Sequence, residues 1–310
     1  MDSVNPATAS AETLVRVQSL SVRFPSPDGH RTVVDEVSFE IRRGEVLGIV
    51  GESGSGKSLT ALSMLKLVDE PGDISSGSVL FDGSDVLRMR RTALQRIRGD
   101  EVGMIFQEPM RSLNPVFTIG RQLIETIRAH ESVDRAEAYA RSVDWLRRVG
   151  LPNEERVMRS YPHELSGGML QRAMIAVALC CRPRLLIADE PTTALDVTIQ
   201  AQILDLLLDL RDETGMALLF ITHDLGVIAE VADEVLVMYG GRIVERGDVF
   251  SLFENPQHPY TEALLKARPR PGQRLDRLPT ISDEVRRIAA GTAIRGSAQG
   301  AGGSSTEAGA

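Results

Sequence analysis

Residues 51–58, Gly-Glu-Ser-Gly-Ser-Gly-Lys-Ser, have the residue types and the spacing of a phosphate-binding loop, G-x-x-x-x-G-K-[ST]. An apolar run of strand type over residues 46–50 precedes the loop, and residues 59–65 can begin a helix. Glycines allow backbone N–H groups to turn towards phosphate oxygens, and a helix N-terminus attracts the same anion. Lys57 would reach the β- and γ-phosphates, and Ser58 would bind Mg²⁺. A glycine-rich turn is the alternative, but this order of elements predicts a nucleotide-binding site.

Two adjacent carboxylates, Asp189 and Glu190, end a buried run that begins at Leu185. In phosphate-loop enzymes a second strand end supplies the metal's other carboxylate, which predicts this role for Asp189. Glu190 would lie near the γ-phosphate, where a carboxylate can orient and deprotonate the attacking water. Without the phosphate loop, the pair could equally be two surface charges at the end of a strand.

Gln107 and His223 each follow another buried run, and parallel strands direct their carboxyl ends at a bound ligand. Gln107 could contact Mg²⁺ or the attacking water, and His223 could form a hydrogen bond with the γ-phosphate. Taken singly, each of these two residues could also be an ordinary loop residue.

A second helix N-terminus suited to phosphate follows Leu165. Ser166 is a candidate N-cap, and Gly167 and Gly168 permit close approach of another backbone or ligand. This segment lies in the helical region, away from the loops that follow the strands. A second such terminus is best explained if it faces the nucleotide of a different subunit.

The remaining pattern predicts strands and one helical region. Residues 14–24 and 33–41 predict an antiparallel pair with a turn at residues 25–29. The pattern is helical from about residue 110 to 182, with an amphipathic helix over residues 135–149. Further expected elements are a strand over 78–81, a short helix over 92–98, strands over 102–106, 185–189 and 217–221, a helix over 197–213, a hairpin over 235–245 and helical structure over 249–267.

Composition restricts the classes of function. The 310 residues carry a net charge of −8, which argues against a broad nucleic-acid-binding face. No apolar run approaches the roughly 18 residues needed to span a bilayer, and the polar, acidic start does not resemble a signal peptide. The two cysteines, Cys180 and Cys181, are expected to be buried free thiols in a reducing compartment. The sequence therefore predicts a cytoplasmic protein that reaches a membrane only through a partner.

The motifs together resemble those of an ABC-type ATPase domain over roughly residues 14–265. They are, in order, the phosphate loop, Gln107, Leu165-Ser166-Gly167-Gly168, Asp189-Glu190, Ala194-Leu195-Asp196 and His223. The Leu-Ser-Gly-Gly element is the specific part. The resemblance implies an α/β fold: a P-loop NTPase (RecA-like) core with an antiparallel β subdomain and a helical subdomain at about residues 110–182. A flexible leader over residues 1–13 and a C-terminal extension over residues 266–310, expected to be disordered from about residue 290, would flank it.

The resemblance also implies that two such domains pack head to tail and enclose two ATP molecules with Mg²⁺. Phe24 lies 27 residues before Gly51 and could be a core residue, but the resemblance favours stacking on adenine. The nucleotide-binding residues implied are Phe24, Gly51, Glu52, Ser53, Gly54, Ser55, Gly56, Lys57, Ser58, Leu59 and, across or at the dimer seam, Ser166, Gly167, Gly168, Gln171 and Asp196. The implied Mg²⁺ ligands are Ser58, Gln107 and Asp189, and the implied catalytic residues are Glu190, His223 and Gln107.

Two further segments resemble the ATP-binding subunits of oligopeptide/dipeptide importers, whose relatives also serve nickel and glutathione uptake. They are Gln-Glu-Pro-Met-Arg-Ser-Leu-Asn-Pro at residues 107–115 and Asn-Pro-Gln-His-Pro-Tyr-Thr at residues 255–261. The partners implied are a second ABC ATPase (a paralogue or a second copy), two integral membrane permease subunits and, indirectly, an extracytoplasmic solute-binding protein, with no nucleic acid. The implied location is the cytoplasmic side of the inner membrane. Many members carry a cysteine-bearing extension that in some holds an iron–sulfur cluster. No cysteine follows Cys181 here, so no cluster is predicted.

A soluble ABC ATPase that acts on ribosomes or DNA is the alternative function. It would need tandem domains, a long coiled-coil insertion or a basic surface, and the sequence shows one set of motifs and a net charge of −8. A regulatory subunit without activity would lack Lys57, Glu190 or His223, and all three are present. The transported solute, the identity of the second ATPase and the role of residues 268–310 stay open.

Overall fold

The structure, a computed structural model, describes residues 12–193, 195–267, 285 and 288–289. The predicted leader and most of the predicted C-terminal extension lie outside these residues. The described chain forms two sheets with helices around them. The larger sheet has the strand order β10-β9-β3-β8-β7-β6. Its strands are β3 (Val46–Val50), β6 (Val102–Ile105), β7 (Leu185–Asp189), β8 (Ala217–Ile221), β9 (Glu234–Tyr239) and β10 (Arg242–Asp248).

The larger sheet is parallel except for β10, which forms the predicted hairpin with β9. Strands β3, β7 and β8 are buried along their whole length, as expected for parallel strands covered on both faces. Their side chains alternate between two hydrophobic clusters: Leu218 and Phe220 of β8 belong to one, and Leu219 and Ile221 to the other. The sheet is therefore the layer between two cores.

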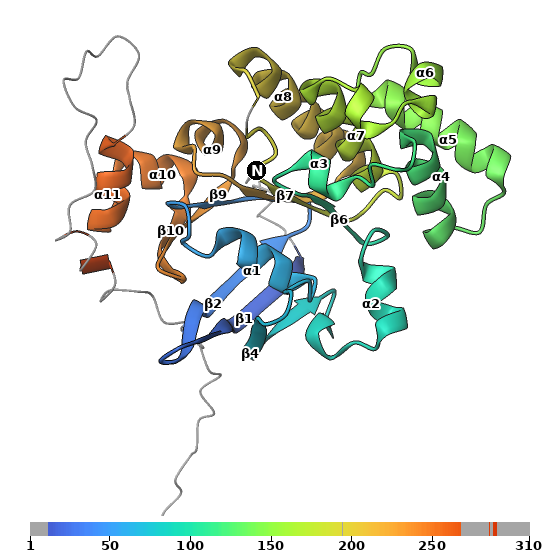
Figure 1. Cartoon of the computed structure of the whole chain (residues 1–310). Coiled ribbons are helices and arrows are strands. Elements are labelled where there is room, and N and C mark those ends of the chain that lie inside the picture. Colours follow the sequence, from blue (N-terminus) through green and yellow to red (C-terminus); the bar gives the residue numbers. More distant parts are fainter. Residues whose placement is uncertain (1–11, 194, 268–284, 286–287, 290–310) are drawn as a thin grey trace, which may run out of the picture.

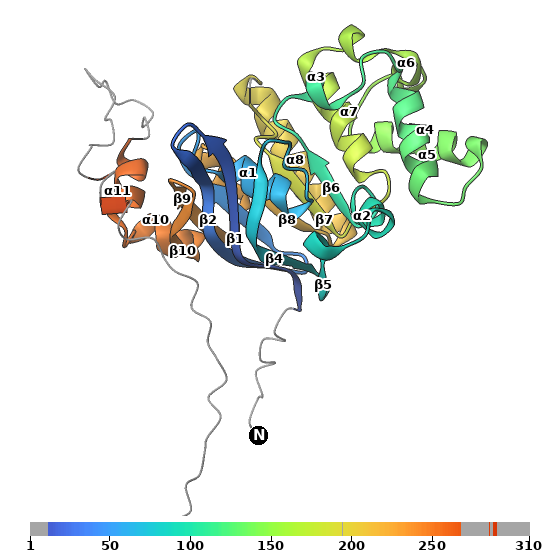
Figure 2. The same cartoon turned by 60° about the horizontal axis from the view of Figure 1, so that its bottom comes forward.

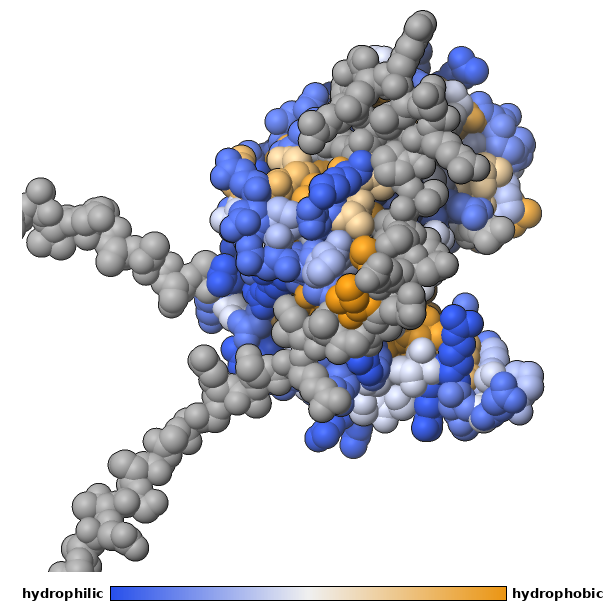
Figure 3. Space-filling model, turned by 90° about the vertical axis from the view of Figure 1, so that its left-hand side faces the viewer, coloured by the Kyte–Doolittle hydropathy of each residue, from blue (hydrophilic) through white to orange (hydrophobic). Residues whose placement is uncertain are grey.

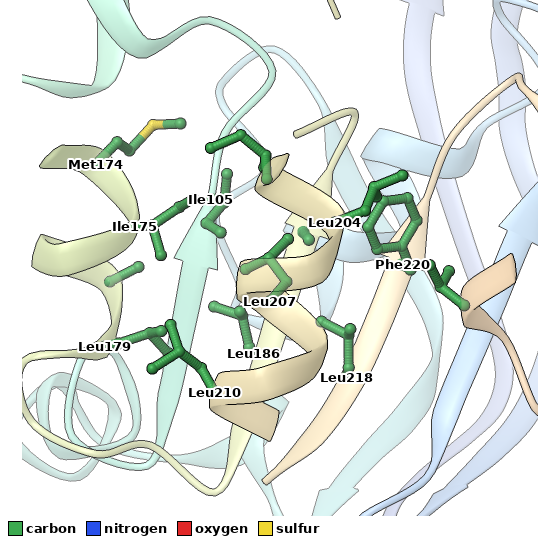
Figure 4. Packing of buried hydrophobic residues seen from close by; sticks show 14 of the residues in the cluster. Ile105, Met174, Ile175, Leu179, Leu186, Leu204, Leu207, Leu210, Leu218 and Phe220 are labelled. Carbon is green, nitrogen blue, oxygen red and sulfur yellow. The ribbon is translucent and has the colours of Figure 1, made fainter. Parts of the chain in front are cut away.

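Helices cover both faces of this sheet. On one face α7 (Gly167–Leu179), α8 (Val197–Thr214) and α9 (Leu225–Val231) contribute to the first cluster. Figure 4 shows Leu204, Leu207 and Leu210 of α8 in one cluster with residues of the sheet and of α7, among them Leu186, Phe220 and Leu179. On the other face α1 (Lys57–Met64) packs between the parallel strands and the second sheet, because Ala61 and Met64 share a cluster with residues of both.

The second sheet is antiparallel, with the order β2-β1-β4-β5. Its strands are β1 (Thr13–Ser26), β2 (Gly29–Arg42), β4 (Asp73–Phe81) and the short β5 (Ser84–Asp85). Figure 2 shows the long strands β1, β2 and β4 side by side next to α1. The predicted antiparallel pair is confirmed as β1 and β2, but the predicted turn at residues 25–29 was too long. Both strands continue, pairing Pro25 with His30 and Ser26 with Gly29.

The predicted helical region is confirmed. It contains α3 (Pro109–Ser112), α4 (Ile119–His130), α5 (Arg135–Arg148), α6 (Glu154–Arg159), the 3₁₀ turn η2 (Pro162–Glu164) and α7. Figure 1 shows α4, α5 and α6 gathered on one side of the molecule. Helix α5 buries Ala138, Trp145 and Leu146 and exposes charged residues, as its amphipathic pattern predicts. The turn η1 (Val86–Arg88) and α2 (Arg91–Ile97) connect β5 of the second sheet to β6 of the larger sheet.

The C-terminal region differs from the prediction. The helical structure expected over residues 249–267 is two helices, α10 (Val249–Glu254) and α11 (Pro259–Lys266). The break is local: the side chain of His258 accepts from the N–H of Tyr260 and caps α11, and proline at its first position favours a new start. Figure 1 shows both helices on the side opposite α4–α6, and hydrophilic residues predominate on the face that Figure 3 presents. Among the described residues no helix is both long and apolar enough to cross a membrane.

Candidate nucleotide-binding and hydrolysis site

The predicted phosphate loop connects β3 to α1, whose first residue is Lys57. Glycine is required at its start, since a Cβ on Gly51 would lie 2.2 Å from the carbonyl oxygen of Met238. At its end Gly56 has φ +101°, in the region that favours glycine. Ser53 and Gly54 are exposed at the tip of the loop. Leu59, in the first turn of α1, packs instead against the core cluster next to this helix.

Lys57 is buried and its ammonium lies within the loop. Its Nζ donates to the carbonyl oxygens of Gly51 and Glu52, at 2.9 and 3.0 Å. Burial lowers the pKa of the Lys57 ammonium, although Glu190 and Asp189 nearby act to raise it. A cation held among glycines at a helix N-terminus is suited to a phosphate ligand.

Ser58 and Asp189 come together as the sequence predicts. The hydroxyl of Ser58 donates to Oδ1 of Asp189 at 2.9 Å, and the carboxylate is buried at the end of β7. Burial raises the pKa of the Asp189 carboxyl, and the hydrogen bond from Ser58 opposes this rise. A hydroxyl and a carboxylate are the hard oxygen ligands that Mg²⁺ prefers, with nucleotide phosphates completing its shell. The residues present therefore fit the expected metal.

Glu190 is the residue on which three neighbours converge. Its Oε2 accepts from Gln107 Nε2 at 2.9 Å and from the hydroxyl of Thr193 at 2.8 Å, and its Oε1 lies 3.2 Å from His223 Nδ1. The structure thus brings Gln107, Glu190 and His223 to one edge of the sheet, as expected from three parallel strand ends. Glu190 also has φ +46°, a conformation that is uncommon for residues other than glycine.

The hydrogen bonds keep Glu190 ionised. Burial alone would raise the pKa of its carboxyl, but the hydrogen bonds from Thr193, His223 and Gln107 outweigh burial and lower the pKa. Sequence reasoning did not identify Thr193. Its position three residues after Glu190, in the turn that follows a strand, was the available signal.

The second helix N-terminus is exposed. Ser166 caps α7 through a hydrogen bond that its Oγ accepts from Met169 N, and Ser166 and Gly167 face solvent. A Cβ on Gly168 would lie 3.1 Å from the side chain of Ile199 in α8. Asp196 caps that helix, accepting from Ile199 N at 3.0 Å. The two helix starts therefore lie against each other.

Three other predicted residues have local roles in the structure. Gln171 is buried, and its amide donates to the carbonyl oxygen of Pro191, which links α7 to the turn after Glu190. Phe24 is half-buried at the end of β1 and packs next to Gly72. Contacts of Phe24, Gln171 and Asp196 with a nucleotide stay predictions. Ala194 lies outside the described residues.

Replacing Thr193 by valine should raise the pKa of Glu190, because it removes one hydrogen bond to the carboxylate while conserving shape. A ¹³C NMR titration of the Glu190 carboxyl measures this directly. Thr126→Val, which alters a threonine bonded within α4, is the control and should leave the titration unchanged. A Glu190 pKa that stays the same or falls in Thr193→Val would contradict this account of its electrostatics.

Comparison with known proteins agrees with these features. Residues 34–193 match the family model described as ABC transporter, and residues 244–296 match the one described as oligopeptide/dipeptide transporter, C-terminal region. The dipeptide transport ATP-binding protein DppD of Escherichia coli is 48% identical over 272 residues, 88% of this chain and 83% of the relative. A probable peptide ABC transporter ATP-binding protein of Sinorhizobium fredii is 51% identical over 277 residues, 89% of this chain and 83% of the relative.

Solved structures show the same fold. A dimeric ATP-binding cassette in a post-hydrolysis state, bound to ADP and Pi, superposes with a TM-score of 0.69 at 26% identity, covering 76% of this chain and 98% of that chain. CbiO1 of Clostridium perfringens, part of the cbiONQ ABC transporter complex, gives a TM-score of 0.66 at 27% identity, covering 82% and 95%. The predicted ABC ATPase fold is thereby confirmed. The chain belongs to the ABC transporter family and, within it, to the ATP-binding proteins of the oligopeptide/dipeptide type.

Proposed function

We propose that this chain is the ATP-hydrolysing subunit of an importer for dipeptides, oligopeptides or a related small solute, and that it works as a head-to-tail dimer. The observation that carries the proposal is the single cluster formed by Lys57, the Ser58–Asp189 pair and Glu190 with its three donors. The names of the relatives and the match of the C-terminal region support a peptide as the solute.

In this proposal the chain's own residues bind the nucleotide and move one proton. The loop N–H groups and Lys57 hold the β- and γ-phosphates, and Phe24 stacks on adenine. Mg²⁺ held by Ser58, Asp189 and Gln107 would neutralise charge on the phosphates. Glu190, kept ionised by its hydrogen bonds, accepts a proton from the attacking water, and His223 donates a hydrogen bond to the γ-phosphate.

The exposed start of α7 supports the head-to-tail arrangement. Ser166 and Gly167 present a helix N-terminus to solvent, and the helix has no acidic residue in its first turn. Such a terminus is suited to the γ-phosphate bound by another subunit. Binding of ATP at the dimer interface drives closure only if the closed dimer binds ATP more tightly than the open dimer does.

Exposed hydrophobic side chains near Gln107 support a contact with a membrane subunit. Phe106, Met110 and Val116 are 37%, 50% and 69% exposed, on and around α3 at the start of the helical region. All three lie within residues 106–116, and exposed apolar side chains that form a patch commonly mark sites of protein contact. We infer that permease subunits bind here and that the closing motion reaches them through this region.

Glu190→Gln should abolish hydrolysis, with a loss of roughly 10²–10⁴-fold in kcat, because the amide cannot accept the proton. ATP binding should persist, since the substitution conserves shape, and the variant should accumulate as a closed dimer in the presence of ATP. Phosphate release and size-exclusion chromatography measure the two effects. Hydrolysis at the wild-type rate would show that Glu190 does not accept the proton from the attacking water.

Ser166→Arg should block hydrolysis without weakening ATP binding to the isolated chain, because the bulky cation obstructs only the nucleotide of the facing subunit. Isothermal titration with ATP and an activity assay of the assembled dimer separate these effects. Ser76→Arg, on an exposed serine of β4, controls for the added charge and should leave both values unchanged. A large loss of ATP affinity in the isolated Ser166→Arg chain would contradict the proposal that Ser166 contacts the nucleotide of the facing subunit.

A further inference from the structure

Helix α11, in the C-terminal region of the chain, contacts the phosphate loop directly. Tyr260, its second residue, is fully buried, and its hydroxyl oxygen accepts a hydrogen bond from the backbone N–H of Glu52 at 3.1 Å. More than two hundred residues separate the two partners in sequence. None of the nucleotide motifs includes Tyr260.

The same peptide group is held at its other end by Lys57. The N–H of Glu52 and the carbonyl of Gly51 belong to one planar unit, so fixing the direction of one fixes the other. The carbonyl accepts from Lys57 Nζ at 2.9 Å, while the N–H donates to Tyr260. Tyr260, the peptide and Lys57 therefore form a continuous chain of hydrogen bonds, in which each bond polarises the next.

Tyr260 is itself held rigidly. Its ring packs against that of Tyr239 at the end of β9, with centroids 4.6 Å apart. Its N–H donates to Nδ1 of His258, the residue that caps α11. The N–H of His258 in turn donates to the buried carboxylate of Glu245 in β10, at 3.1 Å. The hydroxyl thus projects towards the loop from a packed element rather than from a free loop.

We propose that Tyr260 is a positioning residue for Lys57: by fixing the Gly51–Glu52 peptide, it holds the carbonyl that directs the ammonium. The His-Pro-Tyr segment at residues 258–260 is then a support for the nucleotide site. This inference rests on the proposed role of Lys57 in binding ATP. Without the hydroxyl, the part-buried N–H of Glu52 loses this partner and the peptide is held less firmly, so the ammonium is less well placed.

The test is a double-mutant cycle on the purified full chain with ATP as the probe. Tyr260→Phe removes only the hydroxyl and should weaken ATP binding by up to roughly tenfold, as expected for the loss of one hydrogen bond. In a Lys57→Ala background the same change should cost less than about threefold, because the ammonium to be positioned is gone. Tyr239→Phe, which removes a hydroxyl from the neighbouring ring, is the matched control and should bind ATP like the wild type.

A purely structural role gives a different result. Thermal unfolding of all four proteins of the cycle, without nucleotide, shows whether each is folded. Equal losses of affinity from Tyr260→Phe in both backgrounds, or no loss in the wild-type background, would overturn the positioning role even if the melting temperature falls. If Lys57→Ala alone left ATP affinity unchanged, the proposed site would fail instead, so the two failures can be distinguished.

Discussion

The site depends on the order of four parallel strands. Because β3, β8, β7 and β6 are neighbours in that order, the segments that follow them meet at one edge of the sheet. Lys57 follows β3, His223 follows β8, Asp189 ends β7 with Glu190 directly after it, and Gln107 follows β6. The hydrogen bonds on Glu190 and the Ser58–Asp189 pair are consequences of this order. The hydrophobic packing that fixes the register of the strands therefore also determines where the residues of the site lie.

Neighbouring charged groups of the site have pKa values that are shifted in different directions. Burial raises the pKa of Asp189 and lowers that of Lys57, so burial favours the neutral form of each group. At Glu190 three donors outweigh burial and favour the carboxylate. Two adjacent carboxyls at the end of one strand thus have opposite pKa shifts. The geometry separates their candidate roles: Asp189 pairs with Ser58 where a metal would bind, and Glu190 lies among Gln107, Thr193 and His223 as the candidate base.

Much of this arrangement could be predicted from the sequence, because strand runs and their polar endings are local signals. The phosphate loop, the Ser58–Asp189 pair and the meeting of Gln107, Glu190 and His223 follow from them. Thr193 and the Gln171–Pro191 contact were not predicted, because they depend on how a turn and a helix pack. The contact of Tyr260 with Glu52 was found only in the structure, since it is determined by where α11 lies. The break at residues 255–258 was missed although Pro259 offered a local signal.

The most direct test of the central claim is to identify what the chain binds in the cell. The full chain carries a C-terminal tag, membranes are solubilised gently, and proteins that copurify with the tag are identified by mass spectrometry. We expect two integral membrane proteins together with a second ABC ATPase, which is either another copy or a paralogue. Recovery of the chain with ribosomes, DNA or soluble proteins alone would contradict the importer and favour an ATPase without a transport role.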